Sequence, residues 1–418
     1  MKLRLNILLL VAALMVGAGF TSCSDDDFTA SIFDTTERPL DRTQYSFPLD
    51  TFIKKNFLEP YNLQFLYRME DIGSDMQKNL VPASYDKSVD LAVLSKYLWY
   101  DVYKQLSAEG VTVDNQFSSN PTFLQSYSPR IIHVIGSASY NTSTGTETLG
   151  TAEGGKKITL YKVNRLDPND IDFINEYFFK TMHHEFGHIL DQTIQRPTEF
   201  NTISNGLYDA TDWGNKPDSC AVALGFVSNY ASSQAREDWV EVMANYIVKD
   251  SITWAHMLNT ASYDWEDRDD IDEDWYNSLI KPGCNYDSIG YSHRTSGGDF
   301  KVFRRVIDRD ANGYALNGQI TYPNGGNADG VDGRAVILQK LELVRNWLAR
   351  SFHIDLDKLR AEVQKRQYLT NPDGTFQKDA NGRFINRLIS PSESDPSVSL
   401  IDSLRQQVYQ YKALQVTQ

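Results

Sequence analysis

Cysteine is scarce in this sequence, since its 418 residues contain three: Cys23, Cys220 and Cys284. So few thiols cannot build the disulfide framework with which small secreted domains replace a hydrophobic core. Cys220 and Cys284 allow one bridge in an oxidising compartment, and the alternative is that no bridge forms. The fold must therefore depend on a hydrophobic core, for which 41% hydrophobic and 12% aromatic residues are sufficient.

Positive charge is also in deficit. The chain has 41 lysines and arginines against 55 acidic residues, which gives a formal net charge of −14. Such a chain repels the phosphate backbone of nucleic acids and the surface of anionic lipids. We therefore expect no nucleic acid among its partners.

The N-terminus has the composition of a secretory signal. Lys2 and Arg4 precede an apolar run over residues 7–20, and the small residues Thr21 and Ser22 follow it. The run is short for a membrane-spanning helix and leads directly to a small-residue cleavage site. We therefore expect residues 1–22 to be a signal peptide that is removed.

The cysteine after this segment resembles the cysteine of a bacterial lipobox, although Phe20 replaces the usual aliphatic residue. The acidic run over residues 24–27 resembles the export tag of surface lipoproteins in Bacteroidota. The resemblance implies a lipid on Cys23 and anchorage in the outer membrane, facing the extracellular side. Residues 23–45 are then an acidic tether. The alternative is a cleaved signal ahead of a polar linker.

Hydrophobic periodicity predicts a small sheet and several amphipathic helices. Strands are expected over residues 62–68, 130–136 and 156–164, and a helix over 88–105. Asp167 and Pro168 predict the start of a helix whose apolar stripe continues towards Pro197. Further helices are expected over 235–249 and at two C-terminal segments, the second of them capped by Asp355. This pattern is typical of an α+β fold.

The segment His184-Glu185-Phe186-Gly187-His188 lies in the first of these long helices. One helical turn separates the two histidines, so both imidazoles can reach one ion. Zn²⁺ favours this arrangement, because it binds neutral imidazole and has room for a third protein ligand and a water. Glu185 lies about 100 degrees around the helix and is placed to act as a general base. The sequence therefore predicts a zinc-dependent hydrolase.

A third protein ligand must come from elsewhere in the chain. Asp191 lies on the same helix, where it is better placed to support a ligand histidine by a hydrogen bond than to bind the metal. Glu237 and Glu241 are four residues apart on the next predicted helix and share a face. One of these two glutamates is expected to bind zinc.

These segments together resemble the zinc site of anthrax lethal factor and its relatives, metallopeptidases of the gluzincin group. In those enzymes the third ligand is a glutamate, with a second glutamate four residues later and a tyrosine seven residues earlier. The resemblance implies that Glu237 binds zinc and that the Glu241 carboxylate supports the ligands without binding the metal. It also implies that Tyr230 donates a hydrogen bond to the oxyanion, the substrate oxygen that becomes negatively charged during hydrolysis. A phenol beside zinc can stabilise developing negative charge. A role of Tyr230 in the core or at the surface is the alternative.

A longer stretch, residues 20–250, resembles the substrate import-associated zinc metallohydrolase lipoproteins, zinc-binding metallopeptidases found with TonB-dependent import systems in Bacteroidota. The shared features include Pro60-Tyr61-Asn62, Gly154-Gly155 and Gly225-Phe226. The resemblance implies a gluzincin-like fold with peptide or protein substrates. It also implies that a TonB-dependent transporter and its surface lipoprotein are partners. We expect residues 46–260 to form the catalytic core, and residues 261–418 to form a loop-rich insertion and a C-terminal helical portion.

Two other functions fit the same residues. The first is a surface protein that binds peptides or glycoproteins and uses zinc for structure alone, although such a protein would have no use for Glu185. The second is a zinc amidase that acts on a nonpeptide substrate. The motif by itself does not decide between peptide and other amide bonds.

Three further segments carry weaker expectations. The strand over residues 156–164 directly precedes the histidine helix, where many zinc peptidases pair an extended substrate. His183 is expected to lie behind the motif or at the surface. The segment from Asp308 to Gln319 begins like a calcium loop but ends in glutamine instead of a bidentate glutamate, which favours a plain turn.

Overall fold

The computed structural model describes residues 39–69, 80–140, 156–261, 331 and 333–416, together with the course of the strands at 147–148, 150–153, 263–268, 291–295 and 298–306. Residues 42–418 form one compact unit. The expected signal peptide, Cys23, Cys284 and the segment from Asp308 to Gln319 lie outside the described residues.

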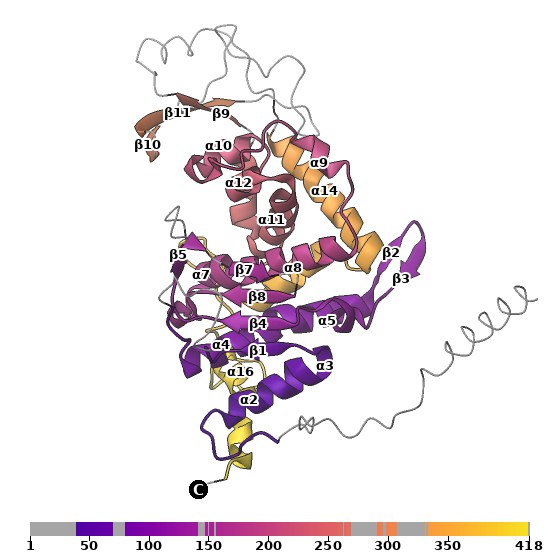
Figure 1. Ribbon diagram of the computed structural model, residues 1–418, viewed down its shortest axis with the longest axis vertical. Coiled ribbons are helices and arrows are strands. Elements are labelled where there is room, and N and C mark those ends of the chain that lie inside the picture. Colours follow the sequence, from indigo (N-terminus) through magenta and orange to yellow (C-terminus); the bar gives the residue numbers. More distant parts are fainter. Residues whose placement is uncertain are drawn as a thin grey trace, which may run out of the picture. The chain divides into compact units, whose positions relative to one another are not determined.

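A four-stranded mixed sheet lies beside the histidine helix (Figure 1). Its strands follow the order β1 (Gln64–Leu66), β4 (Ile131–Val134), β8 (Lys157–Leu160) and β7 (Gly150–Glu153). The first three run parallel to one another, whereas β7 runs antiparallel to β8. Ile132, Ile158 and Leu160 on the two central strands share one face of the sheet and have no exposed surface, so this face packs against the core.

Three long helical segments each contain one π-helical turn. They are α2 (Phe47–Ile53), η1 (Lys54–Leu58) and α3 (Glu59–Tyr61); α4 (Tyr85–Ser95), η2 (Lys96–Tyr100) and α5 (Asp101–Glu109); and α7 (Ile171–Ile174), η4 (Asn175–Phe179) and α8 (Lys180–Thr193). A π turn has more residues per turn than an α-helix, so apolar residues exactly four apart stay on one side. In the third segment Ile174, Phe178 and Met182 follow this spacing, and none of them is exposed.

The histidine helix begins later than the sequence predicted. Asp170 caps α7, because its carboxylate accepts a hydrogen bond of 2.9 Å from the backbone N–H of Phe173. Asp167, the expected cap, instead accepts the backbone N–H of Asn169 in a local turn. At the other end α8 stops at Thr193, before Pro197.

Helix α11 (Ala235–Val248) is the central helix of the unit. It packs against α8, α14 and α15, and α8 in turn contacts β7 and β8 (Figure 1). Every residue of α11 from Glu237 to Val248 is buried, a wider burial than the single apolar face that the sequence predicted. A polar side chain on such a helix has to find its partner inside the protein, because an unpaired buried polar group is costly.

Short elements connect the core helices and strands. They are β2 (Val111–Val113), β3 (Gln116–Ser118), α6 (Phe123–Tyr127), β5 (Ser139–Tyr140), β6 (Glu147–Thr148), η3 (Val163–Arg165), α9 (Phe200–Ile203), η5 (Trp213–Asn215), α10 (Asp218–Ala223), η6 (Tyr230–Ser233) and α12 (Ser251–Thr260). Strands β9 (Tyr263–Arg268), β10 (Tyr291–Thr295) and β11 (Gly298–Val306) form a separate antiparallel sheet in the order β10-β11-β9.

The C-terminal portion is helical, as predicted. It contains α14 (Gly333–Phe352), α15 (Leu356–Gln367), α16 (Leu400–Tyr409) and η7 (Gln410–Leu414). The carboxylate of Asp355 caps α15 as expected. Helix α16 was not predicted, and it packs against α4 and α2. Mixed helices and a small sheet confirm the α+β class. Within the part of the chain that the structure describes, no helix has the length and apolar character needed to cross a membrane.

Candidate metal centre

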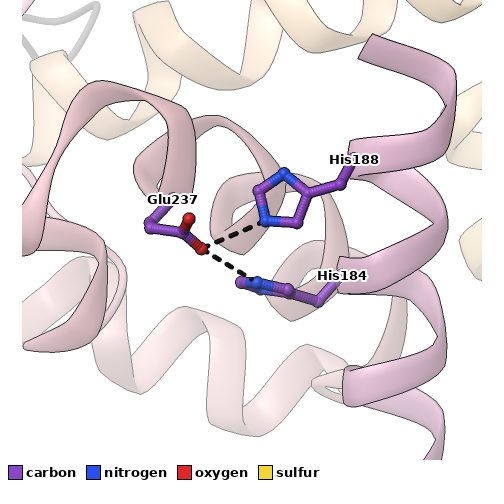
Figure 2. Close-up of side chains that lie close together, drawn as sticks. All are labelled: His184, His188 and Glu237. Atoms are coloured by element: carbon purple, nitrogen blue, oxygen red, sulfur yellow. Dashed lines mark hydrogen bonds and ion pairs between the residues drawn. The ribbon is translucent and has the colours of Figure 1, made fainter. Parts of the chain in front are cut away.

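Helix α8 directs two histidines towards the first turn of α11. The rings of His184 and His188 are 4.9 Å apart between centroids. Glu237 on α11 places Oε2 at 3.1 Å from Nε2 of each ring (Figure 2). All three side chains are buried, and one possible ligand atom from each lies within 4.8 Å of the others. The structure thus brings together the three residues that the sequence analysis assigned to the metal.

The three side chains fit a zinc ion. Two imidazole nitrogens and one carboxylate oxygen are ligands that zinc takes in open sites. Their observed nitrogen-to-oxygen separations of 3.1 Å are close to the ~3.3 Å expected between two ligands of one tetrahedral zinc ion. Burial disfavours the charged form of His184, but hydrogen bonds to Glu237 and Glu241 outweigh burial and raise the pKa of His184 to about 10. The pocket therefore favours a positive charge at this point.

Glu241 forms a hydrogen bond with the ring nitrogen of His184 that faces away from Glu237. Nδ1 of His184 lies 2.8 Å from Oε1 of Glu241, and the other carboxylate oxygen accepts bonds from the Ser228 hydroxyl at 2.6 Å and the Asn245 amide at 3.0 Å. Burial opposes ionisation of Glu241, but the charge of Lys180 and the bond to His184 hold its pKa well below the usual range. A proton on Nδ1 leaves the lone pair of Nε2 directed at the metal position.

Asp191 was expected to support a ligand histidine, and the structure gives its carboxylate a different partner. Among the described residues, the Asp191 carboxylate binds no histidine: it accepts the backbone N–H of Arg196 at 2.8 Å and the guanidinium of Arg196 at 2.5 Å. Nδ1 of His188 instead lies 3.4 Å from Nε of Arg236. The predicted role of Asp191 is therefore wrong, because the chain beyond Thr193 brings a competing arginine to its carboxylate.

Glu185 and Tyr230 both lie beside the ligand cluster. Glu185 is 7% exposed. Burial raises its pKa, although the neighbouring rings of His184 and His188 act in the opposite direction. The Tyr230 ring lies 5.8 Å from the His184 ring, and its edge packs on Trp213. Burial first, and the charge of Glu237 second, raise the pKa of Tyr230, so its hydroxyl keeps its proton.

His183 is a core residue. It has no exposed surface, so of the two expected positions, behind the motif or at the surface, the second is wrong. Its Nδ1 lies 3.0 Å from the hydroxyl of Tyr103 on α5. Burial lowers the pKa of His183 to about 3, so the ring is neutral. His183 therefore ties α8 to α5 and is not directed at the metal position.

Helices α8 and α11 cross closely at Gly187. A Cβ atom on this residue would lie 2.8 Å from Cε of Met243 and 2.9 Å from Cγ1 of Val240. Contacts this short do not occur at real Cβ atoms, so a larger residue requires its neighbours to shift. Cε of Met243 ends a flexible side chain, whereas the β-branched Val240 has less freedom to move. Gly187 therefore sets the distance across which Glu237 reaches both histidines.

The residue after Glu237 points into a second polar cluster. Oδ2 of Asp238 lies 2.6 Å from Nζ of Lys340 on α14, and neither side chain is exposed. The same ammonium donates a hydrogen bond of 2.8 Å to the carbonyl of Gly225. This pair attaches α14 both to the ligand helix and to the loop that leads to η6.

Several of these residues were missed by the sequence analysis. Asn245 carried a signal, because it continues the four-residue spacing of Glu237 and Glu241 along one face. Arg236, Ser228 and Lys340 carried none, since their contacts depend on how separate segments pack.

The strand expected to pair with substrate is not an edge strand. β8 pairs with β4 on one side and with β7 on the other, so its backbone is already hydrogen bonded in both directions. The edge of the sheet near α8 is β7. The expectation for residues 156–164 is therefore wrong, because the sequence did not reveal the return strand before them.

Comparisons with known proteins agree with this geometry. Residues 42–357 match the model of the family described as "Putative zinc-binding metallo-peptidase". The chain is also similar to a zinc-binding metallo-peptidase of that description from Bacteroides caccae, whose crystal structure is known. The two share 32% sequence identity with a TM-score of 0.51, over 76% of this chain and 91% of the other. No curated protein matches the chain.

The family match extends over all the residues of the site, from α8 to α14. It agrees with the ligand chemistry, which fits zinc. Zinc is therefore the cofactor of this protein, and the chain belongs to the family of zinc-binding metallo-peptidases that this model describes.

Proposed function

We propose that this protein is a zinc-dependent metallopeptidase that hydrolyses peptide or protein substrates, with a metal site of the lethal-factor type. The proposal rests on one observation: possible ligand atoms of His184, His188 and Glu237 lie within 4.8 Å of one another. A buried glutamate next to one of the ligands, Glu185, adds the group that hydrolysis needs and that a structural zinc site does not. The family match supports peptide bonds as the target.

Glu185 is the general base of the proposed reaction. A bound zinc ion supplies Lewis acidity, which polarises a carbonyl and lowers the pKa of a coordinated water towards neutrality. The Glu185 carboxylate accepts a proton as the water attacks the carbonyl carbon, and it then donates that proton to the leaving nitrogen. Among the described residues, no hydrogen-bond donor holds its carboxylate in another direction, so the group is available for both transfers.

Tyr230 is the proposed oxyanion donor. Its hydroxyl stays protonated because burial and the Glu237 carboxylate raise its pKa. Its ring lies beside that of His184, on the segment that leads into α11. A phenol in this position can donate a hydrogen bond to the oxygen that gains negative charge during attack.

The extended substrate is proposed to lie along β7. This strand is the free edge of the sheet beside α8, and it runs antiparallel to β8. An edge strand offers unpaired backbone N–H and C=O groups to an extended peptide. A peptide paired with β7 would be held beside α8 with its backbone in a defined direction.

We further propose that the protein acts as a lipoprotein of the outer membrane, facing outwards. The signal-like N-terminus, Cys23 and the acidic run after it support this location. Hydrolysis beside a TonB-dependent transporter and its surface lipoprotein would supply fragments for import. Labelling with a radioactive fatty acid tests the anchor: Cys23→Ala should abolish incorporation.

The activity is tested by digesting a proteome-derived peptide library with the zinc-loaded protein and with Glu185→Gln. The wild type should produce new peptide termini with a reproducible sequence preference. Glu185→Gln should produce none while its zinc content stays at one ion per chain, because the substitution removes the base and leaves the ligands. Metal analysis of both samples provides the control.

Two outcomes would overturn the proposal. Retained peptide binding without any cleavage by the wild type would favour a surface binding protein with structural zinc. Cleavage of glycan-linked or cell-wall amides with no cleavage of peptides would favour the zinc amidase.

A further inference from the structure

An arginine stands at the rim of the metal centre without an acidic partner. Arg236 immediately precedes Glu237 in the first turn of α11, and its side chain is exposed. Among the residues that the structure describes, no carboxylate lies within ion-pair distance of its guanidinium. Some arginines of this acidic chain are paired with carboxylates, as Arg196 is with Asp191 and Arg405 with Asp90. Others, such as Arg130 and Arg366, bond carbonyl or amide oxygens of the described chain instead.

The contact that Arg236 does make is with a ligand histidine. Its Nε lies 3.4 Å from Nδ1 of His188, on the opposite side of the ring from the nitrogen that faces Glu237. A guanidinium can only donate hydrogen bonds, so this contact requires a lone pair on Nδ1. A neutral imidazole that binds a metal through Nε2 carries its proton on Nδ1. The contact and metal binding therefore compete for the same ring.

The position of Arg236 is unfavourable for the helix itself. The N-terminal end of a helix carries partial positive charge, so a cation in its first turn is disfavoured. Two acidic residues share this turn, but Glu237 faces the histidines and Asp238 pairs with Lys340. A bound zinc ion would add positive charge to the same pocket. A carboxylate of a bound ligand would offset this unfavourable charge at the rim of the metal centre.

We propose that Arg236 binds a carboxylate of the substrate next to the scissile bond and thereby selects acidic peptides. This inference rests on the proposed peptidase function and names its substrate class. The guanidinium presents parallel N–H groups that match the two oxygens of a carboxylate. Because Arg236 is adjacent to a ligand in sequence and touches another in space, the bound carboxylate lies within one or two residues of the bond that is cleaved.

The carboxylate can come from a glutamate or aspartate side chain or from the C-terminus of the peptide. The two sources share one chemistry, and matched probes separate them. The first pair is N-acetyl-Ala-Glu-Ala-amide and N-acetyl-Ala-Gln-Ala-amide. The second pair is N-acetyl-Ala-Ala with a free carboxyl terminus and the same dipeptide with a terminal amide.

The test measures binding, so it does not depend on turnover. The zinc-loaded Glu185→Gln protein is titrated calorimetrically with all four probes. The same titrations are carried out with two double variants, which combine Glu185→Gln with Arg236→Gln or with Arg236→Lys. Arg350→Gln is the matched control, because it removes the same charge from an arginine on α14 that is 55% exposed and pairs with Asp114. Zinc itself attracts carboxylates, but it does so equally in all variants.

The acidic probe of at least one pair should bind about tenfold more tightly than its amide, the size expected for charge-assisted hydrogen bonds. Arg236→Gln should reduce this ratio about tenfold, Arg236→Lys should retain part of it, and Arg350→Gln should leave it unchanged. The pair that responds identifies the side chain or the C-terminus as the source.

An acid-to-amide ratio that is the same with and without Arg236, including a ratio of one, would overturn the inference. Loss of zinc from the Arg236→Gln variant would also overturn the inference. It would show that Arg236 positions His188 for metal binding and does not select the substrate. Library digestion keeps the two proposals apart. Cleavage without any change of preference in Arg236→Gln refutes the acidic selectivity alone, whereas absence of cleavage refutes the peptidase.

Discussion

His184 and Glu241 are joined by a hydrogen bond of 2.8 Å between Nδ1 and Oε1, while the opposite nitrogen of the same ring faces Glu237 at 3.1 Å. One imidazole thus connects two carboxylates of a single helix. Because α11 supplies both, its position relative to α8 decides whether the metal ligands meet.

Replacing Glu241 by glutamine should weaken zinc binding about 10- to 100-fold, the usual cost of losing the group that orients a ligand histidine. If the oxygen of the new glutamine still accepts the hydrogen bond from His184, its amide nitrogen faces the amide nitrogen of Asn245. Both nitrogens are donors, so the hydrogen bond from Asn245 is lost. Zinc affinity is measured by competition with a chromogenic chelator. Glu342→Gln, at an exposed carboxylate on α14, should leave affinity unchanged. Equal affinities of the two variants would contradict this role.

Gly187→Ala should lower both stability and zinc affinity, because the added methyl group overlaps Val240 and Met243. Overpacking of this kind costs about 1–3 kcal/mol of unfolding free energy. Urea unfolding and metal analysis measure the two effects. Gly214→Ala is the control, since nothing lies within 4 Å of a Cβ there. The second substitution Val240→Ala should recover part of the affinity, and no recovery would argue against helix spacing as the cause.

Lys340→Met should destabilise the protein by about 3–5 kcal/mol, because it leaves the buried carboxylate of Asp238 without its counter-ion. The double variant with Asp238→Asn should be more stable than the single one. Its neutral amide oxygen can still accept the 2.9 Å bond that the Tyr208 hydroxyl now donates to the carboxylate. Denaturant midpoints compare the variants. A double variant as unstable as the sum of its parts would show that the pair does not act as a unit.

Alkaline pH should unfold the protein through its buried tyrosines. Burial raises the pKa of Tyr100 and of Tyr103 above the ordinary value of 10.0, so their neutral forms are favoured in the folded state. Their contribution to stability is therefore fully present below about pH 10, and it is lost as the pH rises further and unfolded tyrosines ionise. Phenolate absorbance followed together with circular dichroism should show these tyrosines ionising only as the helices are lost. Ionisation of all tyrosines with intact helices would contradict this.

Local patterns in the sequence predicted the central part of the site. The histidines one turn apart, and Glu237 and Glu241 four residues apart, are periodic features of single helices, so their shared faces follow from helix geometry. The α+β class and the helices α11, α14 and α15 followed from apolar spacing in the same way.

The sequence could not reveal contacts that depend on packing. Asp191 has the spacing of a supporting acid, but Arg196 takes its carboxylate once the chain turns after α8. Lys340 reaches Asp238 across about a hundred residues of chain, a distance that no local pattern reports. The cap of α7 was misplaced because Asp167 and Asp170 both suit a helix start, and the hydrogen bond to Phe173 decides between them.

The central claim is that one zinc ion is held by His184, His188 and Glu237. Anomalous diffraction at the zinc absorption edge from crystals of the zinc-loaded protein tests it most directly. The account predicts a single strong peak about 2.0–2.2 Å from Nε2 of both histidines and from a carboxylate oxygen of Glu237. A peak that lacks any one of these three atoms in its coordination sphere, or no peak between α8 and α11, would contradict it.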